Sequence, residues 1–225
     1  MSPVRVIGGG LAGSEAAWQI SRRGHAVELF EMRPRRFPPA HRTGDLAELV
    51  CSNSLKSLRT DRASGLLKEE MRLAGSLILE SAVKASIPGG SSLCVDRALF
   101  ASRVTAAIES AGNIRIVREE VLDIPSPGPV VIATGPLTSD TLLDRLATLI
   151  GRESLFFYDA IAPTVDAETI NWEQVFVQDR YAGPGAGTYV NCPLDGKQYE
   201  SLVNALRSAD QVRRREFEDS RHFEA

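Results

Sequence analysis

The sequence predicts an α/β fold with a parallel sheet, and three patterns near its amino-terminal end carry that prediction. Residues 4–7 are a short β-branched run followed directly by glycines, which is typical of a buried parallel strand. Residues 11–23 have helical character and end at Gly24. Residues 26–31 form a second strand-like run. A strand–helix–strand unit of about thirty residues forms a right-handed parallel crossover, so these segments predict the start of a parallel sheet.

The junction between the first strand and the helix carries the spacing G-x-G-x-x-G, formed by Gly8, Gly9, Gly10, Leu11, Ala12 and Gly13. In this pattern Gly8 permits a tight turn, Gly10 lets the backbone approach a pyrophosphate, and Gly13 permits close helix–strand packing. The free N–H groups at the start of the helix attract the same anion. Glu31 closes the second strand, where an acid can bind both hydroxyls of an adenosine ribose. We therefore predict a Rossmann-type dinucleotide-binding domain, with a chance glycine turn as the alternative.

A later segment favours FAD over NAD as the dinucleotide. Residues 130–135 form an apolar strand that ends in Ala-Thr-Gly, and they resemble the second fingerprint of flavoproteins with two dinucleotide-binding domains. Thr134 and Gly135 are accordingly predicted to border the cofactor. The alternative for this tripeptide is an ordinary strand-to-loop turn. Val121 resembles the position whose backbone borders the adenine. A β-meander is expected before this fingerprint, with strands at 114–117, 120–124 and 129–133.

The remaining segments predict an FAD-binding domain over residues 1–150 and the start of a second, mixed α/β insertion domain over residues 151–225. The loop 32–47 has no periodicity, and a loop of that length is usually functional or mobile. Asp96 is a good N-cap for a helix to residue 110, because its carboxylate can accept first-turn N–H groups. Further helices are predicted at 64–72, 76–84, 139–150, 196–208 and 213–220, and strands at 155–158, 175–177 and 188–190.

Composition excludes several classes of function. Of the 225 residues 43% are apolar, and the net charge is 26 − 29 = −3, as in ordinary globular proteins. The odd number of cysteines, without a CxxC or HxxxH spacing, predicts neither a metal site nor a disulfide framework. No signal peptide and no apolar stretch long enough for a membrane span is apparent, so a cytoplasmic protein without membrane contact is expected. The arginines at 33, 35 and 36 are interpreted either as a solvated surface or as a local basic face.

Cys51 is the candidate catalytic residue. It lies between Val50 and Ser52-Asn53-Ser54, a polar setting that is unusual for a core cysteine, and a thiolate needs hydrogen-bonding or positive neighbours to react. A structural role is the alternative. Cys94 and Cys192 lie next to apolar or strand residues and are interpreted as buried structural thiols.

Taken together, several segments resemble one family along essentially the whole chain. The chain is similar to the folate- and FAD-dependent tRNA uracil-5-methyltransferases, which are relatives of larger flavoproteins that modify wobble uridines. The segments that carry the resemblance are 8–17, 31–34, 47–54 and 133–138, with further matches at 67–72, 95–97, 157–160 and 189–193.

The resemblance implies a reaction and its participants. Such enzymes take a one-carbon unit from methylenetetrahydrofolate, and reduced FAD carries it to C5 of a uridine in tRNA. NAD(P)H reduces the flavin. Cys51 matches a family cysteine with a proton-handling or flavin-adjacent role, and Arg33 falls in the segment that contacts the cofactor. Arg33, Arg35, Arg36 and Lys56 are predicted to hold tRNA phosphates.

One departure from the family pattern concerns its second cysteine, which adds to C6 of the uracil and follows a Phe-Glu-Gly segment. Residues 223–225 resemble that segment, and the sequence has no cysteine after it. We therefore expect an N-terminal portion, completed by a second polypeptide or covered in a homo-oligomer. The alternatives are another folate- or uridine-linked FAD oxidoreductase, since a fold does not fix its substrate, and a non-catalytic module that binds FAD or RNA.

Overall fold

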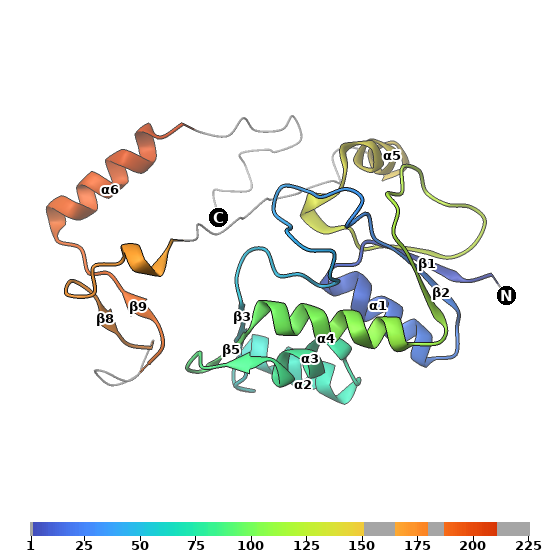
Figure 1. The fold of residues 1–225 in the computed structure, drawn as a ribbon, viewed down its shortest axis with the longest axis horizontal. Helices are drawn as coiled ribbons and strands as arrows, with labels where there is room; N and C mark the ends of the chain where they lie inside the picture. The colour runs from blue at the N-terminus through green and yellow to red at the C-terminus, as the bar shows by residue number, and fades with distance from the viewer. Residues whose placement is uncertain (1, 151–164, 180–186, 211–225) are drawn as a thin grey trace. The chain divides into compact units, whose positions relative to one another are not determined.

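A computed structural model describes residues 2–150, 165–179 and 187–210, which form two compact units (Figure 1). The first unit contains residues 2–87 and 91–150. The second contains residues 88–90, 165–179 and 187–210. The predicted strand at 155–158 and the predicted helix at 213–220 lie outside the described residues.

The first unit is built on a four-stranded parallel sheet with the order β6-β2-β1-β7. Its strands are β1 (Val4–Ile7), β2 (Val27–Phe30), β6 (Ile114–Val117) and β7 (Val130–Ile132). Numbered along the chain, these four strands lie in the order 3-2-1-4, which matches the first four positions of the Rossmann strand order 3-2-1-4-5-6. The predicted Rossmann-type fold is therefore confirmed.

Helices cover both faces of this sheet. In Figure 1, α5 (Asp140–Ile150) lies above the strands, whereas α1 (Leu11–Arg22) and α4 (Arg97–Ser110) lie below them. The helix α3 (Leu77–Lys84) packs against both α1 and α4, and α2 (Ala63–Leu73) packs against α3. The core between these helices and the sheet consists of fully buried apolar side chains, among them Val6, Ala17, Leu29, Phe100, Val104 and Ile108.

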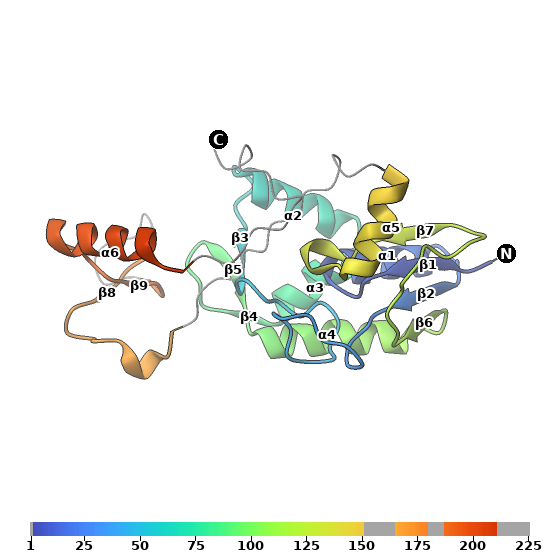
Figure 2. The same cartoon turned by 90° about the horizontal axis from the view of Figure 1, so that it is seen from above.

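The long connection from β2 to β6 contains a small antiparallel sheet that the sequence did not predict (Figure 2). Its order is β3-β5-β4, with β3 (Ser54–Ser57), β5 (Ser92–Val95) and β4 (Ser86–Ile87). These strands are short and rich in serine, so they lack the apolar alternation by which strands are recognised. Cys94 lies buried in β5, in agreement with its interpretation as a structural thiol.

The expected β-meander before β7 is wrong. Residues 120–124 form no strand, and β6 and β7 lie at opposite edges of the parallel sheet. The connection between them carries Pro125, Pro127 and Pro129, which have no N–H to donate to a strand ladder. Gly128 adds a positive φ of 124°, which an extended strand does not contain.

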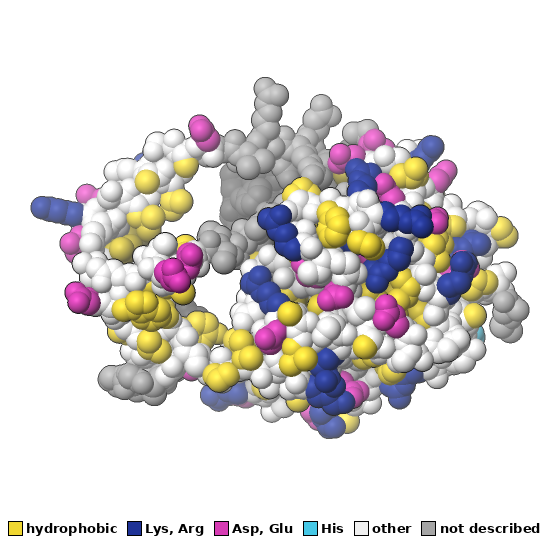
Figure 3. Space-filling view, viewed as in Figure 1, with side chains coloured by type: hydrophobic (Ala, Val, Ile, Leu, Met, Phe, Trp, Pro, Cys, Tyr) yellow, Lys and Arg dark blue, Asp and Glu magenta, His cyan; other side chains and the backbone are white. Residues whose placement is uncertain are grey.

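The second unit contains η3 (Ala167–Thr169), β8 (Phe176–Val177), β9 (Val190–Asn191) and α6 (Gly196–Ser208). None of its described residues in 165–179 and 187–210 is buried, and hydrophobic side chains lie on its surface (Figure 3). Its exposed large side chains include Trp172, Phe176, Tyr189, Tyr199, Leu202 and Leu206. Cys192 is also exposed, so its interpretation as a buried thiol is wrong. The reason is that β8 and β9 form a two-stranded ribbon without a covering layer among the described residues.

Across the described part of the chain, no helix has both the length and the apolar character that crossing a membrane requires.

The N-cap of α4 gives a first prediction. The Asp96 carboxylate accepts a hydrogen bond from the Leu99 N–H at 2.9 Å, as the sequence predicted. Asp96→Ala is expected to lower the free energy of unfolding by about 1 kcal/mol, because that N–H loses its partner. Asp96→Asn keeps an acceptor and should retain most of the stability. Urea unfolding of both variants measures the difference, and equal losses would contradict the capping role.

Candidate dinucleotide-binding site

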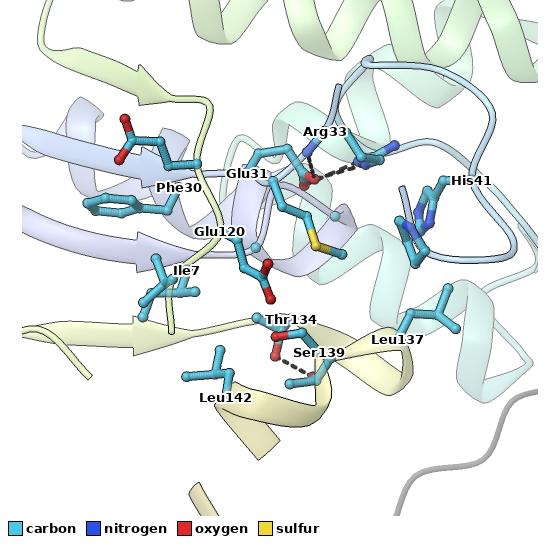
Figure 4. Close-up of a pocket in the computed structure, with 17 residues that line it drawn as sticks. Ile7, Phe30, Glu31, Arg33, His41, Glu120, Thr134, Leu137, Ser139 and Leu142 are labelled. Atoms are coloured by element: carbon cyan, nitrogen blue, oxygen red, sulfur yellow. Dashed lines mark hydrogen bonds and ion pairs between the residues drawn. The ribbon is translucent and has the colours of Figure 1, made fainter. Parts of the chain in front are cut away.

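A pocket opens at the carboxyl ends of the parallel strands, where open α/β sheets bind their ligands (Figure 4). Ile7 comes from β1, Phe30 and Glu31 from β2 and its end, and Thr134 from the turn after β7. The other lining residues are Gly8, Gly10, Met32, Arg33, Pro38, His41, Glu119, Glu120, Val121, Leu137, Thr138, Ser139 and Leu142.

The glycine turn at the floor of this pocket has distinct requirements at each glycine. Gly8 has a φ of 101°, and a Cβ there would lie 2.6 Å from the Ala133 carbonyl oxygen. A Cβ on Gly13 would lie 1.7 Å from the Gly8 carbonyl oxygen, so only glycine lets α1 start this close to β1. A Cβ on Gly10 would meet no protein atom within 4 Å. The fold therefore requires Gly8 and Gly13, whereas Gly10 leaves open space beside the pocket.

The amino terminus of α1 begins at this open space, because Gly10 both lines the pocket and precedes the helix. Gly10 is the N-cap residue, and no side chain caps the helix there. The first turn of α1 contains no acidic residue. Uncapped N–H groups and the positive end of the helix dipole form an anion-binding position. This feature and the space at Gly10 together suit a pyrophosphate.

Glu31 and Arg33 face each other at the end of β2 (Figure 4). Glu31 Oε1 accepts hydrogen bonds from Arg33 N at 3.0 Å and from Arg33 Nε at 2.9 Å. Glu31 Oε2 accepts from Gly9 N at 2.9 Å and from Arg33 Nη2 at 3.2 Å. A carboxylate has about four acceptor positions, so the protein itself occupies all of them.

Arg33 is only 2% exposed and has a second carboxylate partner. Its Nη1 donates to Glu48 Oε2 at 2.8 Å and to the Thr43 carbonyl oxygen at 3.2 Å. The guanidinium is thus enclosed between Glu31 and Glu48. A buried charge is stable only when it is paired and hydrogen-bonded, and both conditions hold here.

The titratable groups with shifted pKa values at the pocket include the carboxyls around Arg33 and the imidazole of His41. Burial opposes ionisation of Glu31, but hydrogen bonds and the charge of Arg33 outweigh it and hold its pKa below 4.5. Burial also opposes ionisation of Glu48, and hydrogen bonds from Arg42 and Thr43 nevertheless lower its pKa. The pKa of His41 is lowered by burial and then by the positive charge of Arg33, which favours a neutral imidazole. Its Nδ1 is buried without a hydrogen-bond partner in the described structure.

The structure brings together six of the predicted cofactor-binding residues in the pocket lining: Gly8, Gly10, Glu31, Arg33, Val121 and Thr134. Gly9, Leu11, Ala12, Gly13 and Gly135 do not line it. They build the turn and helix start or, in the case of Gly135, open the short helix η1 (Gly135–Leu137). The sequence missed His41, which lies in a loop without a recognisable motif, and it missed the role of Thr138, although Thr138 ends the family-like segment 133–138.

Of the three arginines interpreted as a solvated surface or a basic face, Arg35 and Arg36 lie on the surface and Arg33 does not. Arg33 is buried, so it is neither a solvated surface residue nor a contact for RNA phosphates. Arg35 pairs with Glu119 at 3.4 Å and Arg36 with Glu120 at 2.5 Å. The Arg35–Glu119 pair is largely exposed, and such pairs contribute little to stability, whereas Glu120 in the second pair is mostly covered. Each pair nevertheless places a negative charge beside an arginine that the sequence alone suggested as a contact for tRNA phosphates.

Cys51 is exposed and precedes β3, and it does not line this pocket. The backbone after it is held locally, because the Ser52 hydroxyl accepts a hydrogen bond from the Ser54 N–H at 3.0 Å. Among the residues that the structure describes, no group of His, Cys, Asp and Glu side chains could hold a metal ion.

The strand order, the glycine turn and the position of the pocket define a Rossmann-type α/β protein. Within that class, the chain belongs to the family described as glucose inhibited division protein A, whose model matches residues 3–225.

Curated relatives are similar to this chain over nearly its whole length. It is 54% identical over 221 residues to methylenetetrahydrofolate–tRNA-(uracil-5-)-methyltransferase TrmFO of Moorella thermoacetica, covering 98% of this chain and 50% of that protein. The protein of the same name from Aquifex aeolicus is 50% identical, with 98% and 49% covered. The chain therefore spans about half the length of the curated relatives it matches. A structure of Aquifex aeolicus GidA shares 20% identity over 60% of this chain and 25% of that chain, with a TM-score of 0.49.

The lowered pKa values give a prediction of pH dependence. A carboxyl group with a folded-state pKa below its ordinary value stabilises the fold above that value, and this stabilisation disappears as the pH falls through the folded-state pKa. The free energy of unfolding is therefore expected to fall as the pH drops below 4.5, the ordinary value for Glu31 and Glu48. In Glu48→Gln the fall should be shallower, whereas the exposed Glu109→Gln should keep the original slope. Denaturant unfolding between pH 7 and pH 3 measures these slopes, and identical slopes in all three proteins would refute the assignment.

Proposed function

We propose that this chain is the FAD-binding portion of a tRNA uridine C5 methyltransferase that uses methylenetetrahydrofolate as the one-carbon donor. The observation that carries the proposal is the 54% identity, over nearly the whole chain, to a relative named for that reaction. NAD(P)H as the reductant of the flavin and a cytoplasmic location belong to the same proposal. Because the chain spans half of its relatives, tRNA binding and methyl transfer are proposed for the chain together with the remaining portion.

The residues around the pocket fit FAD. The N–H groups at the start of α1 would hold the pyrophosphate, with Gly10 providing the space that a side chain would fill. Glu31 lies where it would accept the ribose hydroxyls. The backbone at Val121 would border the adenine, and the turn at Thr134 and Gly135 would lie beside the cofactor. Bound FAD would supply electrons and would carry the one-carbon unit. No amino-acid side chain provides this redox chemistry.

Binding of a ribose requires a rearrangement of hydrogen bonds at Glu31. Its acceptor positions are already filled by Gly9 and Arg33, so two hydroxyls would have to displace Arg33 donors. Arg33 does not become an unpaired buried charge in that exchange, because Glu48 remains at 2.8 Å from its Nη1. The second carboxylate therefore makes the exchange feasible.

Cys51 is the residue of this chain that we propose for proton handling at C5 of the uracil. Its exposed thiol is accessible to a large substrate. A thiol can pass a proton to or from carbon when it is positioned within hydrogen-bond reach. Lys56 is exposed beside this segment, and we propose it as a contact for a tRNA phosphate.

The exposed apolar surface of the second unit supports a partner that covers it. The described residues of this unit include Trp172, Tyr199 and Leu206, each more than half exposed. Large exposed apolar patches mark sites of association. We propose that the portion of the relatives that this chain does not span, or a second copy of the chain, covers this surface.

The space beside Gly10 gives a test of FAD binding. Gly10→Ala is expected to fold normally, because the added Cβ meets no protein atom, and to weaken FAD binding at least about tenfold by occupying the pyrophosphate position. Gly112→Ala is the matched control, since its Cβ also meets no protein atom and it lies in the turn before β6. Flavin absorbance after incubation with FAD and gel filtration reports binding. Equal FAD binding by both variants would exclude the pyrophosphate position at Gly10.

The methyltransferase activity has its own test. The chain, supplemented with the portion of the Moorella thermoacetica protein that it does not match, is expected to transfer labelled carbon from methylenetetrahydrofolate to tRNA. Cys51→Ser should lower the rate at least about a hundredfold, because the proton-handling group is lost, while flavin absorbance stays unchanged. Cys192→Ser, also exposed, should retain the rate. Absence of transfer by the supplemented parent would refute the reaction, and full activity of Cys51→Ser would refute the role of Cys51.

A further inference from the structure

A carboxylate outside the predicted site holds the segment that leads to Cys51. Glu48 Oε1 accepts a hydrogen bond from Arg42 N at 2.9 Å. Glu48 Oε2 accepts from Thr43 N at 3.1 Å, Thr43 Oγ1 at 3.0 Å and Arg33 Nη1 at 2.8 Å. Cys51 follows Glu48 by three positions, and three residues of extended chain span at most about 11 Å. The position of Cys51 is therefore limited by the position of Glu48.

The two residues before Glu48 lie directly on the glycine turn. The Ala47 N–H donates to the Gly9 carbonyl oxygen at 2.8 Å, and Ala47 is completely buried. The Leu46 N–H donates to Thr105 Oγ1 at 2.8 Å. Ala47 also has a positive φ of 54°, a strained conformation for alanine that persists only when surrounding contacts impose it. The segment is therefore held in place by contacts on both sides of Ala47.

We propose that Glu48 is a positioning residue that holds the Cys51 segment on the glycine turn, and so sets where the Cys51 thiol stands relative to the dinucleotide pocket. The role of that thiol rests on the proposed function. The contacts that hold the segment on the glycine turn are present in the chain without any ligand. The guanidinium of Arg33 is the link, because it contacts Glu48 on one side and Glu31 on the other. Glu31 in turn accepts the N–H of Gly9, the residue whose carbonyl oxygen receives the Ala47 N–H.

Two consequences follow from neutralising Glu48. Arg33 would lose one of its two carboxylates and depend on Glu31 alone, so it would compete more strongly with ribose hydroxyls for Glu31. The backbone at residues 42 and 43 would lose a charged acceptor, which loosens the segment through residue 47. The first effect weakens FAD binding, and the second exposes the Ala47 N–H to solvent exchange.

Hydrogen exchange of the 225-residue chain without FAD tests the attachment. In Glu48→Gln, exchange of the Ala47 amide is expected to accelerate at least about tenfold, while the amides of β1 and β2 keep their rates. The Ala47 N–H bonds to Gly9 and not to Glu48, so its exchange reports the position of the segment and not the loss of a direct partner. Glu28→Gln is the control: it removes a β2 carboxylate that pairs with Arg5 and Arg115, and it should leave Ala47 unchanged. Unchanged Ala47 exchange in Glu48→Gln, or equal acceleration in β1 and β2, would overturn the positioning role.

A second variant and a second measurement test the role of Glu48 even if Glu48→Gln does not fold. If Glu48→Gln does not fold, Glu48→Asp, which keeps the charge but has a shorter reach, should accelerate Ala47 exchange in the same direction by a smaller factor. Titration of FAD by fluorescence should show a Kd about tenfold higher in Glu48→Gln than in the parent. An unchanged Kd would overturn the competition at Glu31. A parent that binds no FAD would refute the proposed function, whereas the exchange of Ala47 would still decide the role of Glu48.

Discussion

The burial of the Arg33 guanidinium between two carboxylates is the interaction on which the rest of the pocket depends. It fixes Glu31 at the end of β2, and Glu31 in turn holds the N–H of Gly9 in the glycine turn. It also fixes Glu48, whose carboxylate accepts hydrogen bonds from backbone N–H groups of the loop after β2. Removing one partner of a buried ion pair generally costs about 3–5 kcal/mol, because the remaining charge stays buried without compensation. Strand end, turn and loop are therefore stabilised as one structure.

The elements that the sequence predicted well are those specified by local spacing. The unit β1-α1-β2, the N-cap at Asp96 and the position of Glu31 at a strand end follow from patterns within about thirty residues of chain. The paired role of Arg33 did not follow from any such pattern. An arginine beside a proline in a loop is typical of a surface, and its burial depends on Glu48, fifteen positions further along the chain. Tertiary contacts of that kind have no local signature.

The two errors about strands have a common physical origin. Residues 120–124 carry three apolar side chains, two of them β-branched, as strands often do, but the prolines that follow have no N–H to donate to a strand ladder. Residues 54–57 and 86–87 lack alternation, yet they pair with β5, whose residues are mostly buried and whose backbone groups must find hydrogen-bond partners. In both cases side-chain pattern gave less information than backbone hydrogen bonding. The side-chain pattern does not show that β3 pairs with β5. The location of Cys51, next to β3 and outside the pocket lining, therefore could not be predicted from it.

Both peptide units that flank Gly9 are restrained: the N–H of the Gly8–Gly9 peptide donates to Glu31, and the carbonyl oxygen of the Gly9–Gly10 peptide accepts hydrogen bonds from Ala47 N at 2.8 Å and Ser14 Oγ at 3.2 Å. Rotation of the first unit would break a hydrogen bond to a charged group, and rotation of the second would break two hydrogen bonds. The turn is thus preorganised, and the entropy of ordering it is lost during folding and not when a ligand arrives. A dinucleotide that reaches this turn meets backbone dipoles that are already aligned, so its affinity reflects contact energy more than the ordering of a flexible loop.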